Sequence, residues 1–214
     1  MQKTIKMTCI NSLVLMLLFV VFEPQLVKGI SDSVTVTQAV TEEITISHPD
    51  DVTMSSIAGI TGGTGTGSAI WNIKTNNSAG FNMALKASSA PALTSGGNSF
   101  ADYTESASDV PDYAWSIAAA DSEFGYTVEP ATEADTATIF LDNGLSTCGT
   151  GSTQTVDACW IKFKTTDVVG INRSTITSSS GEDEVVKFRA QSGASHFQPE
   201  GSYTASITAT ALVN

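Results

Sequence analysis

The sequence of 214 residues contains two histidines, His48 and His196, and each of them follows a serine. A hydrolase of the Ser/His/Asp type needs a histidine that hydrogen-bonds to an activated serine. Adjacent residues of a strand point to opposite faces, so Ser47 and His48 cannot meet within one strand. No G-x-S-x-G elbow is present. We therefore predict that both histidines lie in loops, and we assign no catalytic residue and no enzymatic activity.

Paired acidic residues could catalyse glycoside hydrolysis if two carboxylates converged in a cleft. The candidate pairs are Asp109 with Asp112 and Asp121 with Glu123. Both pairs lie in predicted connections between strands, where acidic residues are common as solvated turn formers, and this second interpretation is favoured. Oxygen-rich loops also bind calcium, but the Asp-Asn-Gly sequence at 142–144 lacks the EF-hand spacing and fits a hairpin turn. No metal site and no cofactor are predicted.

Of the three cysteines, Cys9 lies in residues 1–29, which are predicted to be removed as a signal peptide. The other two, Cys148 and Cys159, have ten residues between them. An even pair in an exported chain is typical of a disulfide. A metal site would need further cysteines or histidines nearby, and a redox-active pair is usually spaced more closely. We predict a structural disulfide that joins two neighbouring strands.

Trp160 is the candidate ligand-binding residue. Ile161 and Phe163 share one face of a predicted strand, and Trp160 lies on the opposite face. If Ile161 and Phe163 are in the core, Trp160 is either exposed or covered by the loop at 149–157. An exposed tryptophan could stack on a sugar ring or on a partner protein.

The N-terminal residues of the chain are typical of an exported protein. Residues 1–29 have the features of a secretory signal peptide: Lys3 and Lys6 are positive, Leu13–Phe22 is a run of ten apolar residues, and Val27 and Gly29 suit cleavage. The run is about half of the ~20 residues that a spanning helix needs, so no transmembrane segment is expected. Residues 30–214 are predicted to form one domain, located outside the cell or on its surface.

The charge of the chain excludes several classes of partner. The whole sequence has 10 basic and 22 acidic residues, and removal of residues 1–29 leaves 7 basic and 21 acidic residues, a net charge of −14. A nucleic-acid-binding protein needs a basic surface that follows the phosphates, and a membrane-surface protein often carries a polybasic segment. We therefore predict an acidic secreted protein with no nucleic-acid partner.

From Ser33 onward apolar and polar residues alternate, and no stretch has sustained helical spacing. About nine or ten strands are expected, which is typical of an all-β fold, an antiparallel two-sheet β-sandwich of the Ig-like or jelly-roll-like kind. Trp71 and Trp115 share faces with other apolar residues and are predicted in the core.

The glycine-rich segment 61–67 is predicted as a flexible loop, 88–112 as an ordered connection and the acidic run 182–184 as a solvated turn. The expected strands are one with Val34 and Val36, one with Ile44 and Ile46, a hairpin of 70–75 and 81–86, a hairpin of 113–117 and 124–128, a disulfide-linked pair of 136–141 and 158–166, a strand over 186–190 and a last strand over 203–211.

Two segments carry a resemblance to known proteins. The Trp-Asn-Ile-Lys-Thr-Asn-Asn sequence at 71–77, the following Gly80-Phe81, and the Gly-Ser-Tyr-Thr-Ala-Ser-Ile-Thr sequence at 201–208 resemble small, uncharacterised exported bacterial surface β-sandwich proteins, distantly similar to WxL-type cell-wall-binding domains. This resemblance implies a β-rich module held non-covalently on the cell wall. The last strand lacks the tryptophan and the trailing Leu-x-x-x-Pro of that group, so wall binding is assigned to no residue. The last strand is also similar to the alternating C-terminal strand of fimbrial subunits.

These observations lead to one functional expectation with two alternatives. We expect a non-enzymatic structural or binding protein of the bacterial envelope, with cell-wall glycan or other surface proteins as partners. The first alternative is a pilin-like subunit in which the first or last strand pairs with another copy by strand addition, that is, by self-assembly. The second is a carbohydrate-binding module that uses Trp160.

Overall fold

The computed structural model describes residues 29–214, so the predicted signal peptide lies outside the described residues except for Gly29. The chain divides at Val40 into two units. The described residues of the first unit, 29–40, have no regular secondary structure, and all of their side chains are exposed. The predicted strand with Val34 and Val36 is therefore not present: both valines are 86% exposed.

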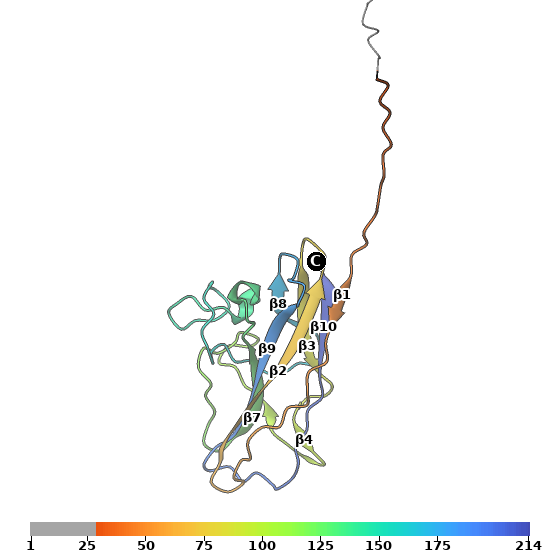
Figure 1. The fold of residues 1–214 in the computed structure, drawn as a ribbon. Coiled ribbons are helices and arrows are strands. Elements are labelled where there is room, and N and C mark those ends of the chain that lie inside the picture. The colour runs from red at the N-terminus through yellow and green to blue at the C-terminus, as the bar shows by residue number, and fades with distance from the viewer. Residues whose placement is uncertain (1–28) are drawn as a thin grey trace, which may run out of the picture. The chain divides into compact units, whose positions relative to one another are not determined.

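The second unit, Thr41–Asn214, is nearly all β, which confirms the predicted all-β class (Figure 1). A five-stranded sheet has the order β1-β2-β9-β7-β6, a three-stranded sheet has the order β10-β3-β8, and β4 pairs with β5. Every pairing is antiparallel except that of β6 with β7. The elements are β1 Ile44–Ile46, β2 Gly63–Thr75, β3 Phe81–Ala87, β4 Thr94–Ser95, β5 Asn98–Ser99, β6 Ala101–Asp102, β7 Ser122–Val128, the 3-10 helices η1 Glu133–Asp135 and η2 Thr138–Phe140, β8 Val168–Arg173, β9 Glu182–Ser192 and β10 Ile207–Val213.

The core consists of the alternate apolar residues of the strands, as the period of two in the sequence predicted. Phe81, Met83 and Leu85 of β3 are fully buried, and they belong to one apolar cluster with Trp71 and Ile73 of β2. Burial of such side chains is the main favourable contribution to folding, roughly 1.5–3 kcal/mol for each large apolar side chain. The predicted core position of Trp71 is confirmed.

The predicted hairpin of 70–75 and 81–86 is wrong, although both strands exist. β2 pairs with β1 and β9, whereas β3 pairs with β10 and β8, so the two strands belong to different sheets. Because each strand buries one apolar face in the same core, the connection at 76–80 carries the chain from one sheet to the other instead of returning it alongside itself. Gly80 is required there: its φ is +81°, and an added Cβ would lie 2.1 Å from the carbonyl oxygen of Arg173.

The glycine-rich segment 61–67 was predicted as a loop, but residues from Gly63 onward form the first part of β2. The reason is close packing, because the irregular segment at 52–57 lies against these residues. A Cβ on Gly67 would come within 2.5 Å of Val52 Cγ1, and one on Gly65 within 2.7 Å of the Ser55 carbonyl oxygen. Glycine thus lets another segment lie directly on the strand.

Three further predictions are corrected by the structure. Residues 113–117 form no strand, and only the second half of that predicted hairpin exists, as β7. Residues 136–141 contain η2 and residues 158–166 are irregular with isolated bridges, so the disulfide does not join two regular strands. The acidic run 182–184 is the first part of β9 and not a solvated turn.

The predicted disulfide between Cys148 and Cys159 is present, with 5.7 Å between the two Cα atoms. Both cysteines are buried in the main core cluster. The bridge closes the loop that precedes Trp160, and it fixes the start of the irregular segment 158–166. A cross-link of this kind restricts the unfolded chain.

We predict that replacing both Cys148 and Cys159 by serine lowers the free energy of unfolding by about 2–3 kcal/mol, because the unfolded chain regains the freedom of the loop. Urea unfolding of the variant and of the unchanged protein measures the difference. Thiol titration of denatured, unreduced residues 30–214, which do not include Cys9, should find no free thiol. Two free thiols would contradict the bridge.

A second prediction concerns Gly125, which faces outward from the middle of β7. A Cβ at this position would lie 2.7 Å from the Ile161 carbonyl oxygen and 2.9 Å from Tyr103 Cβ. Gly125→Ala should therefore lower the free energy of unfolding by about 1–3 kcal/mol. Gly97→Ala is the control, since nothing lies within 4 Å of its added Cβ, and it should stay within about 0.5 kcal/mol of the unchanged protein in the same urea titration.

Candidate functional site

Trp160 is buried and not exposed, and the last residue of the loop at 149–157 contacts its indole. Its side chain is 2% exposed, and Nε1 donates a hydrogen bond of 2.9 Å to the carbonyl oxygen of Asp157. The neighbouring residue Ile161 exchanges two backbone hydrogen bonds with Tyr126, of 2.8 and 2.9 Å. Because side chains alternate along this extended segment, Ile161 and Phe163 enter the core and Trp160 lies on the opposite face of the sheet.

Trp160 belongs to an aromatic cluster on the outer face of the five-stranded sheet. The rings of Trp160 and Trp115 meet edge to face at 5.4 Å, and Trp115 stacks on Tyr103 at 4.2 Å. The Arg189 guanidinium lies 5.3 Å from the centre of the Trp115 ring and 5.9 Å from that of Trp160. Trp115 is half-buried in this outer cluster and does not belong to the main core, which corrects the prediction made for it.

A groove of about 390 Å³ lies beside this cluster. Its polar lining side chains come from β2 and β9, together with the loop before Trp160: Thr66, Ser68, Lys187, Arg189 and Asp157. The Lys187 ammonium is paired with two carboxylates, Glu129 and Asp157, each at 2.8 Å. Arg189 forms no ion pair among residues 29–214, and its Nη2 donates only to Gln191 at 3.3 Å.

The histidines and their neighbouring serines do not form a catalytic pair. His196 contacts the carbonyl oxygen of Ala120 through Nδ1 and the side chain of Gln198 through Nε2. His48 lies on the exposed segment after β1, and Ser47 Oγ accepts a hydrogen bond from the backbone N–H of Asn72.

The candidate carboxylate pairs organise the long connection between β6 and β7. Asp112 accepts hydrogen bonds from the Tyr103 hydroxyl at 3.0 Å and from the backbone N–H of Ser106. Asp109 is paired with Lys164 at 2.8 Å, so the carboxylates of Asp109 and Asp112 bind different groups. In the other candidate pair, Glu123 accepts the backbone N–H of Thr104, and burial raises the pKa of this carboxyl.

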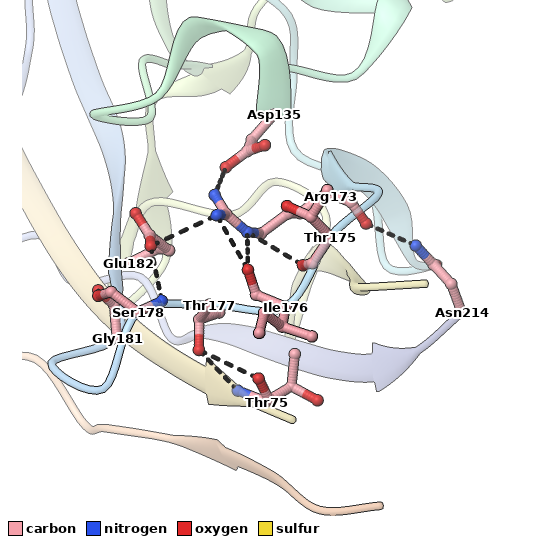
Figure 2. Close-up of polar contacts among 10 residues, drawn as sticks. All are labelled: Thr75, Asp135, Arg173, Thr175, Ile176, Thr177, Ser178, Gly181, Glu182 and Asn214. Atoms are coloured by element: carbon pink, nitrogen blue, oxygen red, sulfur yellow. Dashed lines mark hydrogen bonds and ion pairs between the residues drawn. The ribbon is translucent and has the colours of Figure 1, made fainter. Parts of the chain in front are cut away.

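An Arg173-centred cluster is the polar site that the sequence did not reveal (Figure 2). Arg173 ends β8, and its Nη1 lies 2.6 Å from Asp135 Oδ2 while Nη2 lies 3.4 Å from Glu182 Oε1. The same guanidinium donates to the carbonyl oxygens of Thr175 and Ile176. Figure 2 shows these groups converging on Arg173 from the η1 region, β9 and the loop after β8.

Glu184 is fully buried next to this cluster, and neither of its carboxyl oxygens has a hydrogen-bond partner among the described residues. Burial, with a further contribution from the carboxylate of Asp135, raises the pKa of Glu184 to about 8, although Arg173 acts in the opposite direction. The carboxyl group is therefore protonated at neutral pH. A signal for it was present in the sequence, since Glu182 and Glu184 continue the inward parity of Val186 and Phe188.

The outer edge of β10 is a second candidate site. The residues just before and just after β10, Ser206 and Asn214, form backbone hydrogen bonds of 3.0 and 3.2 Å with residues at the ends of β3. In this register, the backbone N–H and C=O groups of the even-numbered residues of β10 are directed toward β3. The backbone groups of Ile207, Ala209, Ala211 and Val213 therefore point outward, and no strand of the described chain pairs with them. The side chains of these four residues are only half-buried, and those of Ile207, Ala209 and Ala211 pack against the core.

No group of three or more His, Cys, Asp or Glu side chains among residues 29–214 could hold a metal ion. Within the same residues, no helix has the length and apolar character needed to cross a membrane. Comparisons of the chain with protein-family models, curated proteins and solved structures gave no match. Functional inferences therefore rest on the residues of this chain.

Because Glu184 keeps its proton in the folded state, the stability should depend on pH. The unfolded chain loses this proton near the ordinary value of 4.5 and the folded chain near 8. The folded state binds the extra proton between these values, so the free energy of unfolding falls as the pH rises through this interval. The loss approaches about 4–5 kcal/mol above pH 8, at 1.36 kcal/mol per pKa unit.

We predict that Glu184→Gln removes most of this pH dependence and makes the protein more stable than the unchanged chain at alkaline pH. Urea unfolding at a series of pH values measures the effect. Glu133→Gln, at an exposed position of η1, is the control and should leave the slope unchanged. Parallel slopes for the Glu184 variant and the unchanged protein would show that the carboxyl titrates normally.

Proposed function

We propose that the chain is an exported structural protein of the bacterial surface, a two-sheet β-sandwich whose copies assemble by strand addition. The predicted signal peptide, the disulfide and the strongly acidic composition support a location outside the cell. The observation that carries the assembly is the outer edge of β10. This edge is seven residues long, contains no charged residue and no proline, and has no strand partner among the described residues.

An edge without a strand partner is a template for another strand, because its unpaired N–H and C=O groups are directed outward. Soluble proteins usually protect such edges with charges, proline or a bulge. None of these devices occurs in β10, whose pairing with β3 is regular from Ile207 to Val213. The neighbouring strand β1 is three residues long and does not pair with β10.

The strand that fits this edge is the N-terminal arm, residues 30–40, of a second copy. Val34 and Val36 are on one face of the arm if it is extended, and Ser33, Thr35 and Thr37 are on the other. β10 has the same division, with apolar side chains toward the core and Thr208 and Thr210 on the opposite face. A paired arm would therefore cover the half-buried row of β10 with its valines and continue the hydroxyl-bearing face with its threonines.

The proposal predicts that purified residues 30–214 form linear oligomers at high protein concentration, as measured by size-exclusion chromatography with light scattering and by negative-stain electron microscopy. Val34→Asp with Val36→Asp should abolish the oligomers, because the aspartates would enter the core edge. Thr35→Asp with Thr37→Asp is the matched control: it adds the same charge on the outward face and should permit assembly.

The acceptor edge is tested separately by Ala209→Pro. This substitution removes an outward N–H and no hydrogen bond to β3, so the monomer should fold while assembly is lost. A stable monomer of the unchanged protein at all concentrations would contradict the proposal. Oligomers that survive both the arm variant and the edge variant would also contradict it.

A further inference from the structure

The groove beside Trp160 contains a cation, Arg189, that forms no ion pair within the described chain. The mature chain has three times as many acidic residues as basic ones, 21 against 7. Lys187 is nevertheless the cation that takes the nearby carboxylates, Glu129 and Asp157. Arg189 lies at the same groove and forms no ion pair among the described residues. Asp157 also lines the groove and acts on Arg189 at longer range, but its carboxylate is in contact with Lys187. A half-buried guanidinium with no carboxylate in direct contact offers a place for an external anion.

The guanidinium is also held in a fixed position. The faces of two tryptophan rings lie within 5.9 Å of Arg189 Cζ, and its Nε is inaccessible to water and makes no hydrogen bond. Nη2 donates to the Gln191 side chain. Because the stem is fixed, a ligand that bonds the outer nitrogen atoms loses little side-chain entropy on binding.

The opposite wall of the groove provides neutral polar groups. Thr66 and Ser68 lie on β2 in register with Arg189 and Lys187 of β9, and both are exposed. Asp157 and Lys187, which form an ion pair, and the largely buried indole of Trp160 complete the lining. Two hydroxyls and a guanidinium beside this ion pair, within about 390 Å³, suit a small polar ligand with one carboxylate.

We propose that this groove binds a saccharide that bears a carboxylate, a uronic acid or a related acidic sugar, with the carboxylate on Arg189 and the sugar hydroxyls toward Thr66 and Ser68. The site lies on the outer face of the five-stranded sheet and not on the edge of β10. It is therefore independent of the assembly proposed above, and either proposal can fail without the other.

The test is calorimetric titration of residues 30–214 with a glucuronate-containing disaccharide. A neutral glucose disaccharide and sodium acetate are run in parallel to separate the sugar from its carboxylate. We expect binding of the acidic disaccharide that weakens with added salt, and at least about tenfold weaker binding of the neutral sugar and of acetate. Absence of binding, or equal binding of the neutral disaccharide, would overturn the proposal.

Variants locate the site. Arg189→Gln should lower the affinity by about tenfold or more, since a hydrogen bond to a charged group is lost. Lys86→Gln, which removes a half-buried lysine of β3 that pairs with Asp167, is the control cation away from the groove and should bind normally. Because Arg189 is packed on two tryptophans, a second variant leaves it in place: Thr66→Glu puts a carboxylate at the exposed position in register with Arg189 and should abolish binding by pairing with it. Unchanged affinity in Thr66→Glu would overturn the proposed site.

Discussion

The stacking of Tyr126 on Phe163, with 4.1 Å between ring centroids, is the contact on which the arrangement of the sites depends. Residues 158–166 form no regular strand, so side-chain packing adds to the few isolated bridges and the disulfide that hold them. Phe163 also lies 5.5 Å from Phe124 and 6.0 Å from Phe188. With Ile161 and Phe163 anchored in the core, alternation places Trp160 on the outer face, where it forms the groove with Arg189.

The burial of apolar side chains also distinguishes β10 from a strand that is paired on both sides. In β3, which has a strand on each side, the inward residues Phe81, Met83 and Leu85 are fully buried. In β10, which has a partner on one side, the inward residues are only half-buried. A further strand beside β10 would therefore contribute more free energy than its backbone hydrogen bonds alone. It would also remove the half-buried inward side chains of β10 from water. The edge favours a partner whose side chains alternate in the same way.

The alternation of apolar and polar residues predicted which residues of a strand face the core better than it predicted which strands pair. It placed Phe81, Met83 and Leu85 in the core, and it found the strands now seen in β7, β9 and β10. It could not show that β2 and β3 enter different sheets, because a period of two fixes faces and not neighbours. It also missed Glu184, since an acidic run usually marks a solvated turn, and it missed Arg189, whose role depends on the absence of a carboxylate partner in space.

The position of the groove relative to the β10 edge has a consequence for how the two proposals combine. β10 belongs to the three-stranded sheet, whereas the groove lies over β2 and β9 of the five-stranded sheet. A strand added at β10 extends its own sheet and uses none of the residues that line the groove. If both proposals hold, the arm that pairs with β10 leaves the groove residues of that copy unused. A row of weak saccharide sites would then bind a polymeric acidic glycan far more tightly than one copy does, because each site after the first binds at a high effective concentration. Assembly and glycan binding would in that case reinforce each other, although neither site contacts the other.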